Sequence, residues 1–96
     1  MKCYIVFKNG GSWSDYWQEP ISVFTNENHA KAEKMVLNEQ LHKLKEKIRE
    51  IPENLNYVDE CRIVKEITNG LYKSTDDVEE LNDYFIEESE LYLDID

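Results

Sequence analysis

"KCYIVFK", residues 2–8, is rich in β-branched and aromatic residues and runs directly into the turn-forming "NGG" of residues 9–11. Such a segment is typical of a strand that ends in a turn. "PISVFT", residues 20–25, has the same character, and Pro20 stands at its start, where a missing backbone N–H costs least. We therefore expect the two segments to pair as an antiparallel hairpin joined by a long, aromatic-rich loop.

The residues that follow this second segment change to a helical period. Asn26 or Thr25 can cap a helix that we expect over residues 27–50. Pro52 ends it, because the residue before a proline is pushed out of the α region. The apolar positions of this helix follow heptad spacing, at Ala30, Leu37, Leu41, Leu44, Ile48 and Ile51.

Beyond residue 54 the helical period returns. Spacings of three and four predict a second helix, weakened at Asn69-Gly70, through the apolar residues Tyr57, Cys61, Val64, Ile67 and Leu71. We expect this helix to fold back on the first as a helical hairpin. "STDD", residues 74–77, then offers a cap for a short third helix over residues 76–82.

The last segment, "FIEESELYLDID" (residues 85–96), ends in a period of two that is typical of a half-buried strand. We expect this strand to start near residue 90 and to lie beside residues 2–8. Extended backwards, its register places Phe85 on the buried side and Ile86, Glu88 and Glu90 on the other. The alternation itself runs through Leu91, Leu93 and Ile95 on one side and Tyr92, Asp94 and Asp96 on the other.

These elements predict a single α+β domain over residues 1–96. In it, a small antiparallel sheet, made of the N-terminal hairpin and the C-terminal strand, is covered by a helical hairpin. A chain of 96 residues, of which 41% are hydrophobic, has enough apolar surface for one modest core. Its mean hydropathy is -0.69 and no apolar run is long enough to span a bilayer, so we expect a cytoplasmic protein without membrane contact.

The charge of the chain is concentrated at its end. The formal net charge is -10, and residues 74–96 alone contain ten acidic side chains and neither Lys nor Arg. Apolar residues are interleaved with these acids, which indicates a folded segment rather than a solvated tail. Direct binding to nucleic acid is disfavoured, because phosphates attract basic surfaces.

Catalytic and metal-binding patterns are absent from the sequence. Cys3 and Cys61 lie far apart without a CxxC motif, which favours free thiols. His29 and His42 would lie about 20 Å apart on one helix and cannot share a metal ion. No phosphate-binding, nucleophile or zinc-protease motif occurs. We therefore expect no enzyme activity, no cofactor and no metal site.

The loop "GGSWSDYW", residues 10–17, raises a separate question. Trp13, Tyr16 and Trp17 either fold back over the edge of the sheet and bury their rings, or form an exposed aromatic patch that anchors a partner. In the first case Gly10 and Gly11 permit the turn. Both interpretations remain open at the level of sequence.

The first third of the chain, "KCYIVFKNGGSWSDYWQEPISVFTNENHAKAEKMV" (residues 2–36), carries a resemblance. It resembles small phage-encoded accessory proteins that begin Lys-x-Tyr-x-Val, continue with a loop of Gly, Ser, aromatic residues and Asp, and then have Val-Phe and a helix. Most such proteins have no assigned activity. The resemblance implies a compact α+β domain and a phage or prophage origin, and it implies no catalytic residue.

We expect a phage-type accessory protein that inhibits a host protein, of defence or nucleic-acid handling, by binding its basic surface. Alternate strand residues lie about 6.8 Å apart, close to every second phosphate of a DNA strand, so strand acids can mimic DNA. The expected docking residues are the strand acids Glu88, Glu90, Asp94 and Asp96, the acids Asp76, Asp77, Glu79, Glu80 and Asp83, and the aromatic residues Trp13, Tyr16 and Trp17.

Two other interpretations compete with this one. An acidic face can simply keep a small protein in solution. Alternatively, the heptad stripe of residues 27–50 pairs with its copy in a second chain, which makes the protein a structural or oligomerisation module. The chain is accordingly expected to be a monomer or a homodimer.

Overall fold

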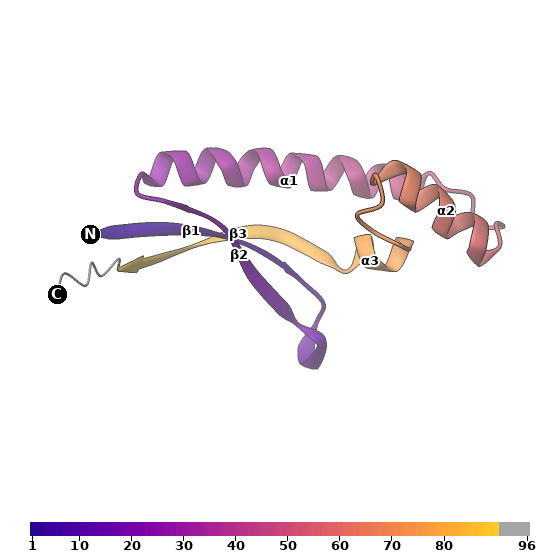
Figure 1. Cartoon of the computed structure of the whole chain (residues 1–96), viewed down its shortest axis with the longest axis horizontal. Helices are drawn as coiled ribbons and strands as arrows, with labels where there is room; N and C mark the ends of the chain where they lie inside the picture. Colours follow the sequence, from indigo (N-terminus) through magenta and orange to yellow (C-terminus); the bar gives the residue numbers. More distant parts are fainter. Residues whose placement is uncertain (91–96) are drawn as a thin grey trace.

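Three antiparallel strands form one sheet with β1 in the centre, in the order β2-β1-β3 (Figure 1). The computed structural model describes residues 1–90. Its elements are, in chain order, β1 (Lys2–Gly10), the 3₁₀ turn η1 (Trp13–Asp15), β2 (Trp17–Phe24), α1 (Glu27–Arg49), α2 (Tyr57–Ile67), α3 (Thr75–Glu79) and β3 (Leu81–Glu90). The expected α+β class and the antiparallel three-stranded sheet are confirmed.

β1 pairs with β2 as the expected hairpin and with β3 as the expected third strand. β3 begins at Leu81, earlier than expected, because its pairing with β1 starts at Gly10 and ends at Lys2 opposite Glu90. The alternating residues 91–96, including Asp94 and Asp96, lie outside the described residues. The strand prediction for them is therefore neither supported nor contradicted.

Both faces of β3 carry partly buried apolar side chains. On one face, the rings of Phe85 and Phe7 stack with their centroids 5.1 Å apart. On the other, Ile86 lies in a hollow that Tyr4 and Lys34 also line, so this face meets α1. The expectation that Ile86 faces solvent is therefore wrong: successive residues point to opposite faces, and α1 covers the face that was assigned to solvent.

α1 packs along the sheet and contacts all three strands (Figure 1). It begins at the N-cap Asn26, whose side chain accepts hydrogen bonds from the backbone N–H groups of Asn28 and His29. Within the heptad stripe, Ala30, Leu41 and Ile48 are buried in the single chain. The stripe is therefore used inside the molecule, and these positions are not free to pair with a second chain.

α2 and α3 form a second, smaller core at the C-terminal end of α1. Ile48 of α1, Val64 of α2 and Val78 of α3 are buried together there. α2 packs on α3 and on this end of α1. The sheet is covered by α1, and not by the whole helical hairpin that we expected. Accordingly, Tyr57 and Leu71, which belonged to the expected apolar stripe, are exposed, and α2 ends at Ile67 before Leu71.

The short helix α3 has the start that the sequence predicts. The hydroxyl of Ser74 accepts from the N–H of Asp77, and the carboxylate of Asp77 accepts from the N–H of Ser74. This reciprocal pair is a capping box and satisfies backbone donors that a helix start leaves free. A single residue, Glu80, separates the end of α3 from the start of β3.

Candidate functional site

The hairpin that joins β1 to β2 projects away from the rest of the molecule (Figure 1). At its end, the side chain of Trp13 is 97% exposed. Its backbone has φ of 53°, a left-handed conformation that non-glycine residues seldom adopt and that costs about 1–3 kcal/mol. Hydrogen bonds from Asp15 N–H to the Ser12 carbonyl (3.0 Å) and from Tyr16 N–H to the Trp13 carbonyl (3.2 Å) hold the turn. The turn thus presents a large aromatic side chain to solvent in a fixed backbone.

The base of the hairpin is fixed to the end of α3. Gly11 donates its backbone N–H to the carbonyl oxygen of Glu80 at 2.9 Å. The side-chain amide of Asn82 donates to the carbonyl oxygen of Gly11 at 3.3 Å. These bonds connect residues about seventy positions apart in the sequence and make the start of β3 the support of the hairpin.

The three aromatic residues of the loop have different environments. Trp17 is half-buried, and its indole ring packs so closely on Gly10 that a Cβ atom there would lie 2.7 Å from the ring. Tyr16 is about half exposed, and its hydroxyl lies 3.5 Å from the side-chain oxygen of Gln18. Trp17 therefore folds back on the hairpin, whereas Trp13 is exposed; that Trp13 anchors a partner stays a prediction.

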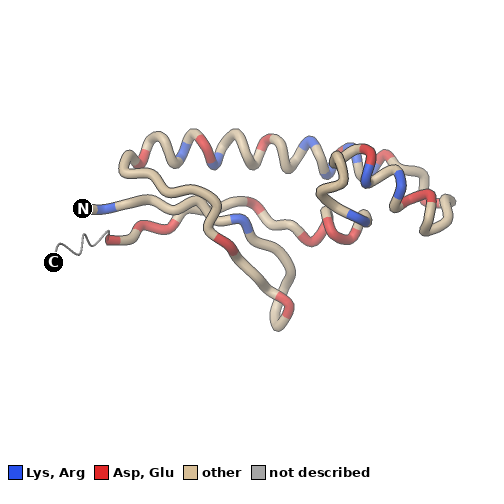
Figure 2. The backbone as a smooth tube through the Cα atoms, in the orientation of Figure 1, with Lys and Arg blue, Asp and Glu red and all other residues tan. Residues whose placement is uncertain are grey.

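The acids of α3 and its C-cap Glu80 are not equally free. Asp77 is occupied by the capping box and Glu79 lies 3.4 Å from Arg49. Asp76 and Glu80 are exposed. Acidic positions on the hairpin and on α3 are visible as red segments in Figure 2.

Three of the four acids of β3 have partners within the chain. The carboxylate of Glu88 lies 3.0 Å from the ammonium group of Lys2, which raises the pKa of Lys2 through a hydrogen bond and charge attraction. Glu90 lies 3.5 Å from the N-terminal amino group. Asp83 lies 2.8 Å from a ring nitrogen of His42. The strand acids therefore do not present a row of unpaired charges.

We call the exposed residues Trp13, Asp15 and Tyr16, together with Glu80 beneath them, the tip surface. It joins part of the aromatic loop with part of the acidic segment, through the bond from Gly11 to Glu80. The structure does not bring Glu88 and Glu90 to this surface, because β3 carries them along β1 toward Lys2.

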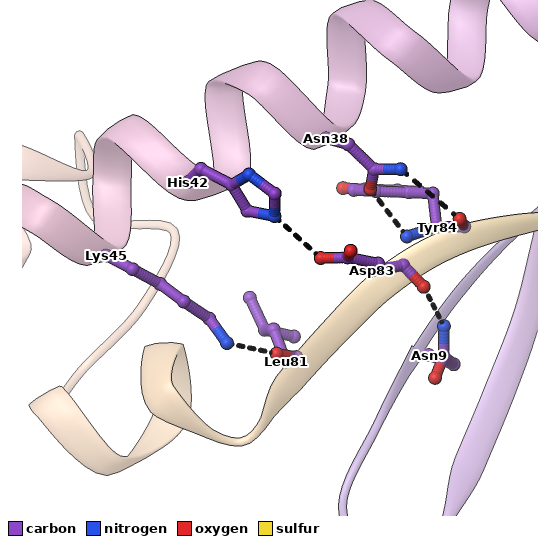
Figure 3. A network of polar contacts seen from close by, with 7 residues as sticks. All are labelled: Asn9, Asn38, His42, Lys45, Leu81, Asp83 and Tyr84. Atoms are coloured by element: carbon purple, nitrogen blue, oxygen red, sulfur yellow. Dashed lines mark hydrogen bonds and ion pairs between the residues drawn. The ribbon is translucent and has the colours of Figure 1, made fainter.

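A polar cluster between α1 and β3 was not foreseen from the sequence (Figure 3). β3 places two residues, Asp83 and Tyr84, opposite the single residue Lys8, which makes a bulge. The side chain of Asn38 accepts from the N–H of Tyr84 at 2.7 Å and donates to its carbonyl oxygen at 3.4 Å. Asn9, which is buried in β1, donates to the carbonyl oxygen of Asp83 at 2.8 Å. The two amides thus satisfy the backbone groups that the bulge leaves unpaired.

The remaining members of the cluster also tie α1 to β3. The ammonium group of Lys45 donates to the carbonyl oxygen of Leu81, and His42 contacts Asp83. Asn38, His42 and Lys45 lie at i, i+4 and i+7 of α1, a polar row that the sequence shows but whose partner it does not identify. Each of these contacts joins a side chain of α1 to the backbone or to a charged side chain of β3, so we call the cluster the clamp.

Beside this clamp, Tyr84 and Lys8 share a partly buried site. Burial raises the pKa of Tyr84. For Lys8, burial acts to lower the pKa, but the hydroxyl of Tyr72 and nearby charges outweigh it, so the pKa is raised. The ammonium group of Lys8 also lies 5.1 Å from the ring centroid of Tyr72, within the range of a cation–π contact.

Within residues 1–90, no three His, Cys, Asp or Glu side chains come together as they would to hold a metal ion. No helix in the same part of the chain is long and apolar enough to cross a bilayer. Comparisons with protein-family models, curated proteins and solved structures found no match for this chain. The resemblance to phage accessory proteins stays a prediction.

Proposed function

We propose that the protein is a non-catalytic binding protein whose tip surface docks on a basic surface of another protein. The observation that carries the proposal is the exposure of Trp13 on a turn that hydrogen bonds hold in place. Trp and Tyr are the commonest anchors of protein interfaces, because they bury a large area with few rotatable bonds. A supported turn also loses little entropy on binding.

The charge around the anchor indicates the chemistry of the partner. Asp15 and Glu80 are exposed on this surface, on a chain with a net charge of -10. Such a surface attracts a basic partner and speeds its approach. Glu88 and Glu90 are left out of the proposed docking surface, because Lys2 and the N-terminal amino group already pair with them.

The resemblance of residues 2–36 supplies a setting for this activity. In a phage-infected bacterium, the partner would be a host protein of defence or nucleic-acid handling, and binding would inhibit it by covering its basic surface. Such an inhibitor needs neither a cofactor nor direct contact with nucleic acid, and it would act in the host cytoplasm. The competing oligomerisation proposal is weaker, because Ala30 and Leu41 of the heptad stripe are already buried within the single chain.

Affinity capture from a bacterial lysate tests the proposal when matched variants are compared. The wild-type chain, Trp13→Ala and Glu39→Gln are immobilised in parallel; Glu39 is an exposed acid on α1 that is paired with Lys43 and lies outside the tip surface. We expect a protein that the wild type and Glu39→Gln retain, that Trp13→Ala loses, and that elutes as salt rises. A partner that Trp13→Ala retains as well as the wild type would contradict the proposed surface.

A further inference from the structure

α2 carries an open apolar groove, and α2 lies at the end of the molecule opposite to the N-terminus and the end of β3 (Figure 1). The groove has a volume of about 650 Å³. Tyr57 and Val58 at its start are 71% and 75% exposed, and Cys61 continues the apolar lining one turn later. A patch of this kind on a small acidic protein marks a docking site for an apolar segment.

The rim of the groove has the opposite charge to the protein as a whole. Arg62, Lys65 and Lys73 line it together with one acid, Glu66. The guanidinium group of Arg62 lies 3.6 Å from the carboxylate of Asp59, so the two residues form an ion pair. The net charge of the chain is -10, so this basic rim stands out locally. The occupant that fits is a segment in which large apolar residues alternate with acids.

Such a segment exists in this chain, just beyond the described residues. "LYLDID", residues 91–96, has apolar Leu91, Leu93 and Ile95 at every second position and acids at 94 and 96. Among the described residues, the last pair of β3 with β1 is Glu90 opposite Lys2. We propose that the α2 groove of one copy of the chain binds residues 91–96 of a second copy.

The length of the segment excludes binding within one chain. β3 has ten residues and therefore carries the chain about 30 Å away from α3, on which α2 packs. Residues 91–96 span at most about 20 Å when fully extended. Figure 1 shows α2 and α3 at one end of the molecule and the end of β3 at the other. The groove of the same chain is thus out of reach.

The end of β3, from which the donor segment continues, and the groove lie at opposite ends of the molecule (Figure 1), so the contact joins unlike surfaces of the two copies. Two copies placed antiparallel along their length close both contacts in a two-fold dimer; otherwise the contact repeats head to tail. The tip surface takes no part in either arrangement. This proposal therefore does not depend on the proposed function.

The test uses the full-length chain and a labelled peptide of residues 87–96. We expect the peptide to bind the wild-type chain with Kd of about 10 μM, and Val58→Asp to weaken binding by at least about tenfold. Val36→Asp is the matched control: the same change at a half-exposed valine of α1, away from the groove. It leaves binding unchanged. Fluorescence anisotropy measures the peptide, and circular dichroism checks that each variant is folded.

Charge reversal supplies a second readout that misfolding cannot imitate. Lys65→Glu with Lys73→Glu should weaken binding of the native peptide, and a peptide with Asp94→Lys and Asp96→Lys should restore it. Sedimentation velocity of the wild-type chain should show self-association at the concentrations where the peptide saturates the groove, and Val58→Asp should reduce it. A peptide that binds wild type and Val58→Asp equally, or a wild-type chain that stays monomeric at those concentrations, would overturn the proposal.

Discussion

The backbone of Gly11 passes so close to Asp15 that a Cβ atom on Gly11 would lie 2.4 Å from the carbonyl oxygen of Asp15. Gly11 also has φ of 76°, a left-handed backbone conformation that residues with a Cβ atom seldom adopt. The hairpin can therefore turn tightly at this point only with glycine, and the tight turn is what leads the chain into the exposed Trp13.

Gly11→Ala should lower the free energy of unfolding by about 2–3 kcal/mol, because it adds a clash to the strain of a positive φ. Gly70→Ala is the matched control. Gly70 has φ of 81°, but nothing lies within 4 Å of its Cβ position, so only the conformational cost of about 1 kcal/mol applies. Urea unfolding measures both. Equal losses would mean that the hairpin relaxes around the added methyl group.

The two tryptophans of the chain should differ in stability and in fluorescence. Trp13→Ala should change the free energy of unfolding by less than about 0.5 kcal/mol, whereas Trp17→Ala should cost about 1–3 kcal/mol through lost packing on Gly10. With Trp17 replaced by Phe, the remaining emission comes from Trp13 and should be red-shifted and strongly quenched by acrylamide. A quenching-resistant Trp13 would show that its ring is covered.

Asn38→Ala should lower the free energy of unfolding by about 1–3 kcal/mol, because it leaves the N–H and carbonyl of Tyr84 without their partner at the bulge. Glu39→Ala, one position along α1, breaks only an exposed ion pair with Lys43 and should cost less than about 1 kcal/mol. Chemical denaturation compares the two. A loss as small as that of the control would show that water replaces Asn38.

Alkaline pH should destabilise the fold through Tyr84 and Lys8. Burial raises the pKa of Tyr84, so the neutral phenol is favoured in the folded state, and the associated stability is full below pH of about 10 and falls above it. The raised pKa of Lys8 acts in the same direction, since its ammonium form is stabilised by Tyr72. Tyr84→Phe should make the melting temperature fall less steeply from pH 9 to pH 11.

Much of the fold follows from local signals in the sequence. The bounds of α1 follow from Asn26 and Pro52, and the start of α3 follows from Ser74 and Asp77, because caps involve residues a few positions apart. The antiparallel place of the third strand beside β1 was also predicted. Its start at Leu81 was not, because pairing with a distant strand rather than the alternation of its own residues sets it.

The candidate site was less predictable for the same reason. Composition places Trp13 and Trp17 in one loop but does not decide which ring faces solvent, because that depends on the contact of Trp17 with Gly10. The clamp joins Asn9 and Asn38 to a bulge 74 and 46 residues further along the chain. The sequence around a polar side chain does not indicate which distant backbone group it binds.

The central place of β1 has a consequence for the order of folding. β1 meets β2 after a short turn, but it meets β3 only after α1, α2 and α3 have been crossed. Closing so long a loop is entropically slower than forming a hairpin, so the hairpin should form early and the addition of β3 should limit the folding rate. During synthesis on the ribosome, the edge of β1 that pairs with β3 therefore stays unpaired until nearly ninety residues have emerged. In that interval this edge can pair with strands of other chains.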